Sequence, residues 1–394
     1  MSNEKKNVAL LSACQGLLVT NNSILLTTNG LAGYALATDK SLATLTFTAF
    51  ILGAALTTMP ASMLMRRYGR RAGFMLGAGF GVAGALLCAA AMLLHNFWLL
   101  CAGGFVVGIY NAYGQYYRFA AADSASASFK SKAISLVLAG GIVGGLIGPE
   151  SSKHTKDLFE GAVFAGSYFS LSIFCLLSMV VLSRIEIPPL TTEEQRDPGR
   201  PLAVIARQPA FFVAVLSSVI GYGAMNLLMT ATPLAMAACE HPFSSAALVI
   251  QWHVIGMFAP SFFTGTLIKR FGTIPVMLTG VVISLSCVAV ALSGTEVAHF
   301  WFALVLIGIG WNFMFVGGTT LLTECHTPSE RAKVQGANDT LIYIMMATSS
   351  LSSGLLFTLK GWVLMNLMAV PLLVAAGAAM VWLHYYRRRA VLPN

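Results

Sequence analysis

The stretch Met65-Arg66-Arg67-Tyr68-Gly69-Arg70-Arg71 lies between two long apolar segments. A similar stretch, Ile268-Lys269-Arg270-Phe271-Gly272-Thr273, follows an apolar segment later in the chain. In both stretches two basic residues precede an aromatic residue and a glycine. The two aromatic residues are 203 positions apart, about half of the 394-residue chain. A looser correspondence joins residues 122–133 to residues 324–333. The repeat predicts a duplicated fold.

The apolar segments have the length of membrane-spanning helices. A helical crossing needs about 20 predominantly apolar residues, and twelve segments reach this length. We predict crossings at about 8–36, 43–65, 72–93, 97–121, 133–152, 162–183, 209–236, 245–268, 274–293, 298–323, 334–358 and 362–386. The predicted fold class is an all-α membrane protein with twelve transmembrane helices in two pseudo-symmetric six-helix halves. Duplicated halves of this kind are typical of secondary transporters, which bind their solute near the bilayer midplane.

The basic residues predict the orientation. With the N-terminus in the cytoplasm, four of the 24 lysines and arginines face outward, namely Lys40, Lys153, Lys156 and Lys360, and the other twenty face inward. Short positively charged loops stay cytoplasmic. We therefore expect a multi-pass protein of the bacterial inner membrane with both termini in the cytoplasm.

The composition excludes a soluble protein. The chain is 57% hydrophobic and 10% charged, whereas soluble domains carry about 25% charged residues. The net charge of +9 comes from short clusters at helix ends, such as Arg387-Arg388-Arg389. Such clusters anchor a protein to an anionic lipid leaflet, so we expect the lipid bilayer as a partner and no nucleic acid.

The sequence shows no pattern of an enzyme. The seven cysteines are scattered without Cys-x-x-Cys pairing, and buried cysteine behaves as a small apolar residue. Metal-ligand spacings of histidine, paired carboxylate spacings and a P-loop are absent from the sequence. We therefore expect no metal, no cofactor, no disulfide framework and no ATP-driven transport. We also expect a monomer.

A polar stretch separates the predicted halves. Arg184 to Arg207 contains Pro188-Pro189 and Asp197-Pro198-Gly199-Arg200-Pro201, and prolines and charges do not cross lipid unaided. The predicted organisation is an N-terminal half at 1–183, a cytoplasmic linker at 184–208 and a C-terminal half at 209–394.

Over nearly its whole length the chain resembles the major facilitator superfamily. That family's loop between helices two and three reads Gly-x-x-x-Asp-Arg-x-Gly-Arg-Arg, and Arg67, Gly69, Arg70 and Arg71 match it. The opening glycine is Ser62 here, and the signature aspartate is Arg66. In the second copy the glycine is kept as Gly265, and the acidic position is Lys269. Because the aspartate is missing, we expect the loop to pack against Asp123, Glu324 or Glu330.

The fifth predicted crossing carries Gly140-Gly141-x-x-Gly144-Gly145-x-x-Gly148-Pro149. It resembles a Gly-x-x-x-Gly-Pro segment of proton-coupled antiporters in the superfamily, although the Gly-Gly that should follow is Ser152-Lys153. The alternative reading is close helix packing, because small residues four positions apart let helices approach.

Crossing four carries a polar stripe. Gly104, Gly108, Asn111, Gln115 and Arg118 are spaced by three and four residues and share one helical face. Such a face is costly against lipid and should line an internal cavity. Arg118 either binds an anionic group of the solute or pairs with Asp123.

In the resembled superfamily, helices one, four, seven and ten line the cavity. The substrate-binding candidates are Gln15, Asn22, Asn111, Gln115, Arg118, Tyr222, Asn226, Gln251, Trp311 and Asn312. Each could instead bond a neighbouring helix. Amides, a phenol and an indole with one arginine fit a neutral or weakly anionic, partly aromatic organic solute.

Ionisable groups within the membrane are functional hypotheses by default. We predict Glu150 and His253 as proton-coupling residues, because burial can bring such groups into the range of proton exchange near neutral pH. The alternatives are a Glu150 that faces water and a His253 that packs. The predicted gating residues are Arg67, Asp123, Glu324, Arg331 and Asp339, with Asp339 capping Arg331 or Lys333.

These patterns predict secondary active transport of a small organic solute by alternating access, coupled to protons. An uncoupled facilitator or exchanger is the alternative within transport. A membrane sensor or scaffold is the alternative outside transport, and it should carry an additional soluble domain.

Overall fold

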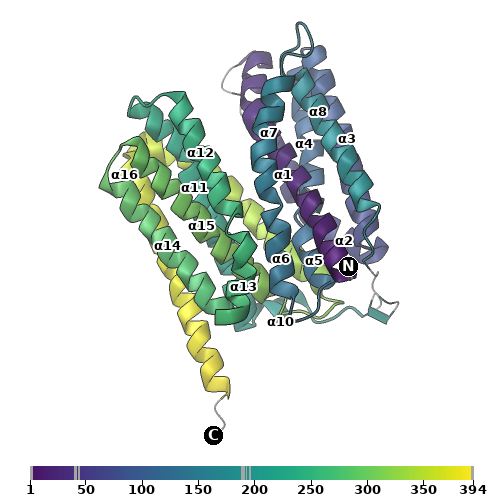
Figure 1. Cartoon of the computed structure of the whole chain (residues 1–394), viewed down its shortest axis with the longest axis vertical. Helices are drawn as coiled ribbons and strands as arrows, with labels where there is room; N and C mark the ends of the chain where they lie inside the picture. The colour runs from purple at the N-terminus through teal and green to yellow at the C-terminus, as the bar shows by residue number, and fades with distance from the viewer. Residues whose placement is uncertain are drawn as a thin grey trace. The chain divides into compact units, whose positions relative to one another are not determined.

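The computed structural model describes residues 3–39, 42, 45–187, 191, 193–194 and 197–391, and these residues form helices without strands (Figure 1). The predicted linker positions Pro188, Pro189 and Arg196 lie outside the described residues. The helices are α1 (Asn3–Leu36), α2 (Leu45–Tyr68), α3 (Arg70–Leu93), α4 (Phe97–Gly114), α5 (Tyr117–Asp123), α6 (Lys130–Ala139), α7 (Gly141–Thr155), α8 (Ala165–Leu182), α10 (Leu202–Ala206), α11 (Pro209–Ala238), α12 (Phe243–Phe258), α13 (Ser261–Phe271), α14 (Thr273–Ser293), α15 (Val297–Leu322) and α16 (Arg331–Val391).

Eleven segments of the described residues are long and apolar enough to cross a membrane. Three of them join two helices each, α4 with α5, α6 with α7, and α12 with α13. The predicted crossing at 334–358 is the first part of α16. This helix breaks at Gly361, where φ is 70° and ψ is −178°, and its second part is the last of the eleven segments. Eleven of the predicted crossings thus correspond to these segments, and the predicted crossing at 334–358 is helical.

The repeated loops share one backbone conformation. Gly69 between α2 and α3 has φ 88° and ψ 160°, and Gly272 between α13 and α14 has φ 90° and ψ 161°. Residues with a side chain rarely adopt a positive φ of this size, which explains the glycine at both sites. The two loops are therefore alike in structure as well as in sequence.

The chain forms two compact units. Unit 1 comprises Met1–Ser126, Leu136–Asp197 and Gln335–Tyr343, and unit 2 comprises Ala127–Ser135, Pro198–Val334 and Ile344–Asn394. Two short segments are exchanged between the units. Residues 335–343, at the start of α16, belong with unit 1, and residues 127–135 belong with unit 2. The first exchange matters for the site below.

The glycines of the fifth crossing pack against α1. A side chain at Gly140 would place its Cβ 2.0 Å from the carbonyl oxygen of Ser12, and one at Gly144 would lie 2.3 Å from that of Gly16. The two helix backbones therefore meet closely, which is the packing interpretation of this segment.

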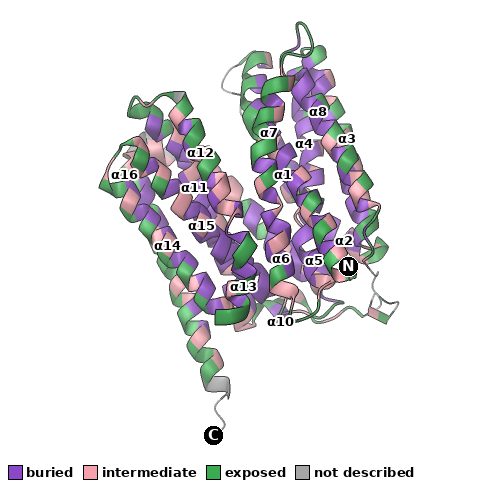
Figure 2. Ribbon diagram, in the orientation of Figure 1, coloured by how far each residue is buried: buried purple, intermediate pink, exposed green. Residues whose placement is uncertain are grey.

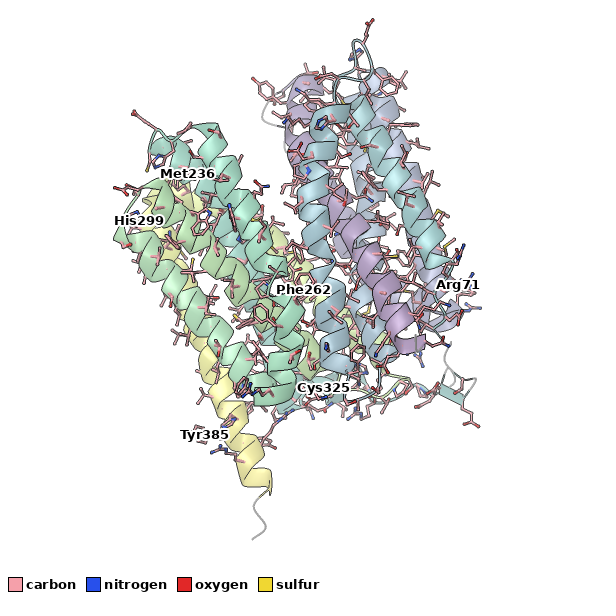
Figure 3. The ribbon with its side chains drawn as sticks, viewed as in Figure 1. Arg71, Met236, Phe262, His299, Cys325 and Tyr385 are labelled. Atoms are coloured by element: carbon pink, nitrogen blue, oxygen red, sulfur yellow. The ribbon has the colours of Figure 1, made fainter. Side chains whose placement is uncertain are left out.

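Apolar side chains also cover outward faces. On α8, five exposed residues share one helical face: Phe169, Ile173, Leu176, Leu177 and Val180 (Figure 2). In unit 2, Phe262 of α13 and Tyr385 of α16 are 58% and 59% exposed (Figure 3). Extended exposed apolar surface marks contact with a membrane. The interiors hold many of the polar residues instead, including Asn21, Asn29 and Asn312.

Candidate functional site

A chain of hydrogen bonds crosses the interior of unit 1. The Asn22 amide nitrogen on α1 donates to Asn111 Oδ1 on α4 at 2.9 Å. The Asn111 amide nitrogen donates to the Tyr343 hydroxyl on α16 at 2.7 Å. Asn111 and Tyr343 are each 4% exposed, whereas Asn22 is half-buried. Two predicted substrate-binding residues, Asn22 and Asn111, are thus bonded to each other. Tyr343, a polar residue of the eleventh predicted crossing, holds Asn111.

A buried ion pair lies in the same unit. Arg118 Nη2 is 2.5 Å from Asp339 Oδ1, and both side chains are 2% exposed. Asn338 donates to the same carboxylate oxygen at 2.8 Å, and Arg118 also donates to the Gln115 side chain at 3.2 Å. Burying two charges is costly unless they pair closely and are hydrogen-bonded. This pair fixes the start of α16 to α5.

The ion pair joins two residues for which the sequence suggested other partners. Asp123 was the alternative partner of Arg118, and Arg331 or Lys333 was the expected partner of Asp339, whereas the structure pairs Arg118 with Asp339. α4 ends at Gly114 and α5 begins at Tyr117, so the continuous face assumed for the fourth crossing is interrupted before Arg118. The Lys333 ammonium instead donates to the carbonyl oxygens of Pro198 and Arg200.

Asp123 pairs with an arginine of the repeated loop. Arg70 Nη2 is 2.8 Å from Asp123 Oδ2 and donates to Gln335 Oε1 at 2.6 Å. The Arg70 guanidinium also lies 5.6 Å from the centre of the Tyr116 ring. This contact confirms that the loop packs against Asp123. Sequence reasoning missed Gln335, although it lies four residues before Asp339 and hence on the same face of α16.

The other predicted gating residues lie elsewhere. Arg67 is exposed, with its guanidinium 5.2 Å from the centre of the Tyr68 ring. Glu324 forms a partly exposed ion pair with Arg387 at 2.9 Å. Arg331 is half-buried at the start of α16. The described contacts of Arg67 and Glu324 are thus with Tyr68 and Arg387.

Glu330, the third acidic residue considered for the loop, binds Arg200 of the linker. Two hydrogen bonds of 2.7 Å join the guanidinium to the carboxylate, which is 2% exposed. The Thr327 N–H donates to the same carboxylate at 3.0 Å. The Arg200 hydrogen bonds hold the pKa of Glu330 well below its usual range.

Unit 2 contains an aromatic cluster. Tyr222 of α11 meets Trp311 and Phe315 of α15 edge to face, with ring centres 5.1 and 4.9 Å apart. Trp311 stacks on Phe315 at 5.0 Å, and Phe258 of α12 lies 5.9 Å from Trp311. Trp311 is 1% exposed. Among the described residues its indole N–H has no hydrogen-bond partner.

The predicted asparagines of unit 2 are bonded to neighbouring helices. Asn312 donates to Met257 O at 2.7 Å and to Ser261 Oγ at 2.5 Å, and accepts from Thr264 at 2.7 Å. Asn226 donates to Met346 O at 3.0 Å and Ser349 Oγ at 2.9 Å. These contacts correspond to the packing alternative for both residues.

The remaining predicted residues differ in burial. His253 is fully buried and its Nδ1 lies 2.8 Å from the carbonyl oxygen of Leu304, which corresponds to its packing alternative. Gln251 is exposed, and Gln15 is 7% exposed on α1.

Comparison with known proteins decides the family. A sequence model of the Major Facilitator Superfamily matches residues 11–251 and 215–394. The chain belongs to the Major Facilitator Superfamily. It is therefore a membrane transporter and not an enzyme, as the sequence patterns predicted.

Individual members of the superfamily resemble the chain to different degrees. It is 42% identical over 370 residues to the riboflavin transporter RfnT of Brucella anthropi, with 93% of each protein covered. It is 27% identical to the uncharacterised transporter YddS of Bacillus subtilis, over 86% of this chain and 81% of that one.

Solved structures confirm the superfamily fold. The transporter FucP in an outward conformation matches with a TM-score of 0.80 at 16% identity, covering 95% of this chain and 98% of that one. The human organic anion transporter MFSD10 matches with a TM-score of 0.77 at 13% identity, covering 96% of this chain and all of that one.

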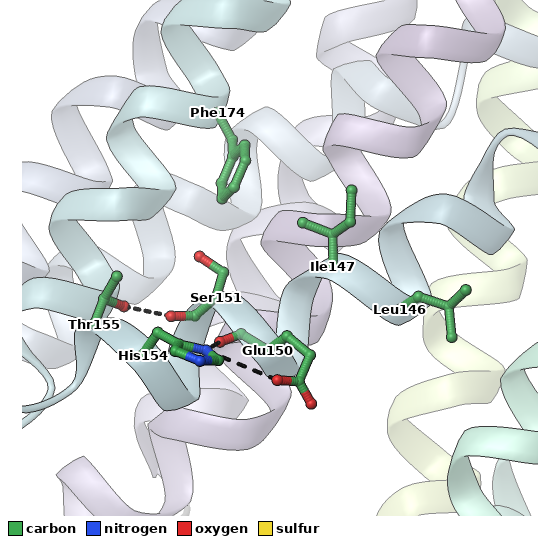
Figure 4. A pocket seen from close by; sticks show the side chains of 7 residues that line it. All are labelled: Leu146, Ile147, Glu150, Ser151, His154, Thr155 and Phe174. Carbon is green, nitrogen blue, oxygen red and sulfur yellow. Dashed lines mark hydrogen bonds and ion pairs between the residues drawn. The ribbon is translucent and has the colours of Figure 1, made fainter.

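One superfamily-type segment leads to an exposed carboxylate. Glu150 follows Gly148-Pro149 on α7, and its side chain is 64% exposed. A hollow of about 530 Å³ is lined by Leu146, Ile147, Glu150, Ser151, His154, Thr155 and Phe174 (Figure 4). His154 Nδ1 lies 2.8 Å from the Glu150 carbonyl oxygen and 3.8 Å from its carboxylate. This exposure corresponds to the alternative of an uncovered Glu150, because α7 continues past Pro149 to Thr155 with this face exposed.

Proposed function

We propose that this transporter carries riboflavin, or a flavin with the same ring system, by alternating access. The observation that carries the proposal is the 42% identity to a riboflavin transporter over 93% of both chains. The extent of the match leaves no large part of either protein without a counterpart.

The chemistry of the predicted residues supports this solute. Riboflavin is uncharged at neutral pH and joins a flat aromatic ring system to a polyhydroxylated chain. The sequence predicted a neutral or weakly anionic, partly aromatic solute. In unit 2, Tyr222 is half-buried at the edge of the aromatic cluster and offers a ring. In unit 1, Asn22 is half-buried and offers amide groups. Stacking and a few placed polar groups are the usual means of binding such a ligand.

Binding and transport can be tested separately. We expect the purified transporter to quench riboflavin fluorescence saturably, and unlabelled lumiflavin, which shares the ring, to compete. Thiamine, a cationic vitamin without this ring, should not compete. Expression should also lower the external riboflavin that a riboflavin-requiring bacterium needs for growth. Absence of both saturable quenching and growth support would refute riboflavin as the substrate.

Proton coupling is part of the proposal, with Glu150 as the first residue to test. In liposomes with an imposed pH gradient, we expect the wild type to accumulate riboflavin. Glu150→Gln, which mimics the protonated carboxyl, should exchange riboflavin without accumulating it. Unchanged accumulation would move the coupling role to Asp339 and then to His253.

Uncoupled facilitation is the second candidate, and the 64% exposure of the Glu150 side chain favours it. Under this alternative, the wild type itself equilibrates riboflavin and does not respond to the pH gradient.

The membrane orientation is also proposed, with both termini in the cytoplasm of a bacterial inner membrane. Single cysteines at Phe271 and at Asp157, two exposed positions, should react with an impermeant thiol reagent from opposite sides. In a background without native cysteines, Asp157→Cys should label from outside and Phe271→Cys only after the membrane is opened. Labelling of both positions from one side would overturn the topology.

A further inference from the structure

We infer that the Asn22 side chain recognises the imide edge of the flavin ring. Asn111 and Tyr343 hold the Asn22 amide in position. The inference rests on the proposed flavin substrate. Beyond that proposal, it names the residue that recognises the flavin ring by hydrogen bonds.

The hydrogen bonds of Asn22 leave part of its amide available. An asparagine side chain carries two N–H donors and one carbonyl acceptor. Asn22 donates one N–H to the side-chain oxygen of Asn111. Within the described part of the chain, its second N–H and its carbonyl oxygen have no hydrogen-bond partner. One planar group therefore presents a donor and an acceptor together.

The rest of the chain of hydrogen bonds fixes where this amide points. Asn111 accepts from Asn22 and donates to Tyr343. Asn111 and Tyr343 are each 4% exposed. Packing leaves such side chains little freedom, so Asn22 is oriented by groups that are themselves held in place. Asn22 is the half-buried member of the three and is the one that a solute can reach.

Other asparagines on α1 provide the contrast. Asn29 is 1% exposed and accepts from the Tyr168 hydroxyl at 2.7 Å. Asn21 is fully buried and donates to the sulfur of Cys175 at 3.2 Å. Both face the interior of the bundle toward α8. Asn22 combines partial exposure with unused hydrogen-bonding groups.

The flavin ring offers the complementary pattern. Its pyrimidine end presents a carbonyl, the N3–H and a second carbonyl along one edge. A primary amide can donate to one carbonyl and accept from the N3–H, as asparagine does when it reads a base edge in two bonds. A site built around such bonds discriminates strongly against an analogue that lacks the donor, because its own polar groups are left unpaired.

The test changes the protein and the ligand in combination. Riboflavin and N3-methylriboflavin, which lacks the N3–H, are titrated by fluorescence quenching against the wild type, Asn22→Leu and Asn22→Ala. Leucine has nearly the size of asparagine and suits a membrane helix. Thermal unfolding identifies any variant that fails to fold, and the other variant then carries the measurement.

We expect the wild type to bind N3-methylriboflavin about tenfold more weakly than riboflavin, the order of one or two lost hydrogen bonds. Both variants should bind riboflavin about tenfold more weakly and discriminate between the ligands by less than about twofold. Tyr343→Phe, which removes the acceptor for Asn111, should reduce the discrimination and leave the fold intact. Discrimination between riboflavin and lumiflavin, which lacks the ribityl chain, should be unchanged in every variant.

The outcomes separate the inference from the proposed function. If the wild type binds neither flavin, the substrate proposal fails. If it binds both flavins equally, or if the Asn22 variants still discriminate at N3, riboflavin remains the substrate and the role of Asn22 is refuted. Loss of the lumiflavin discrimination as well would show general damage to the site, which also refutes the specific role.

Discussion

The two units differ in how they hold buried polar groups, although they repeat the same loop. Unit 1 contains two buried arginine–carboxylate pairs and an amide with unused hydrogen-bonding groups. In unit 2 the amide of Asn312 is bonded on all sides, and the nearby tyrosine and tryptophan belong to an aromatic cluster. A polar residue in a membrane helix is therefore a functional candidate when some of its donors or acceptors have no partner within the protein. Removing a side chain whose hydrogen bonds are all made within the protein should lower stability. Removing one with unused hydrogen-bonding groups should weaken solute binding.

The largest expected effect is at the Arg118–Asp339 pair. Asp339→Ala leaves the guanidinium buried without its carboxylate, which should lower the free energy of unfolding by about 3–5 kcal/mol. Arg118→Met should have a similar cost. Because apolar residues can replace a buried pair without loss, the double variant Arg118→Met, Asp339→Leu should recover most of the stability. Thermal unfolding in detergent measures all three, and a double variant as unstable as the single ones contradicts this account.

Two arginines of one loop test burial against position. Arg70 is 4% exposed and bonded to Asp123 and Gln335, whereas Arg67 is exposed. We expect Arg70→Ala to cost about 2–3 kcal/mol, the range for hydrogen bonds to charged groups. Arg67→Ala, its matched control, should change stability by less than about 0.5 kcal/mol. An equal loss of stability in both variants would show that position in the loop, and not burial of the side chain, determines the loss.

Asn312 sharpens the contrast with Asn22. Asn312→Ala removes three hydrogen bonds, and at about 0.6 kcal/mol for each interhelical bond the expected loss of stability is about 2 kcal/mol. Riboflavin affinity should change little in the protein that remains folded, because both N–H groups and the carbonyl oxygen of the Asn312 amide already bond protein groups. Asn22→Leu should do the opposite, weakening binding with little change in the unfolding temperature. A large loss of affinity in Asn312→Ala would place it among the binding residues after all.

Much of the fold could be predicted because hydropathy and basic loops act locally. The repeated loop located two turns that prove to have nearly identical glycine conformations. The ion pairs could not be predicted, since Arg118 and Asp339 are 221 residues apart and meet only through the packing of α16. Glu150 shows a second limit: sequence placed it in an apolar segment, but exposure depends on which face of α7 the neighbouring helices cover.

The candidate site was predicted in part. The spacing of seven from Gln15 to Asn22 to Asn29 put three amides on nearly one face of α1. Periodicity did not reveal that Asn29 accepts a hydrogen bond from Tyr168 of α8. It also did not reveal that Asn22 makes one described hydrogen bond, to Asn111. Such distinctions depend on hydrogen-bond partners from distant segments.

The smallest effect is a pH dependence at the Arg200–Glu330 pair of unit 2. The pKa of Glu330 is lowered in the folded state by its hydrogen bonds to Arg200, and in the unfolded chain a glutamate titrates at about 4.3. The pair therefore contributes its full stabilisation above that pH and loses it as the pH falls toward the folded-state pKa.

Because the Arg200 side chain is 44% exposed, solvent weakens the interaction. We expect Glu330→Gln to lower the unfolding temperature by about 2 °C at pH 7. The difference from wild type should stay nearly constant down to about pH 5 and shrink as the pH falls below about 4.3. Glu324→Gln, at a more exposed ion pair, is the matched control and should show a smaller difference. A gap for Glu330→Gln that stays constant or widens with acidification would mean that the carboxylate stabilises the fold through its shape and not through its charge.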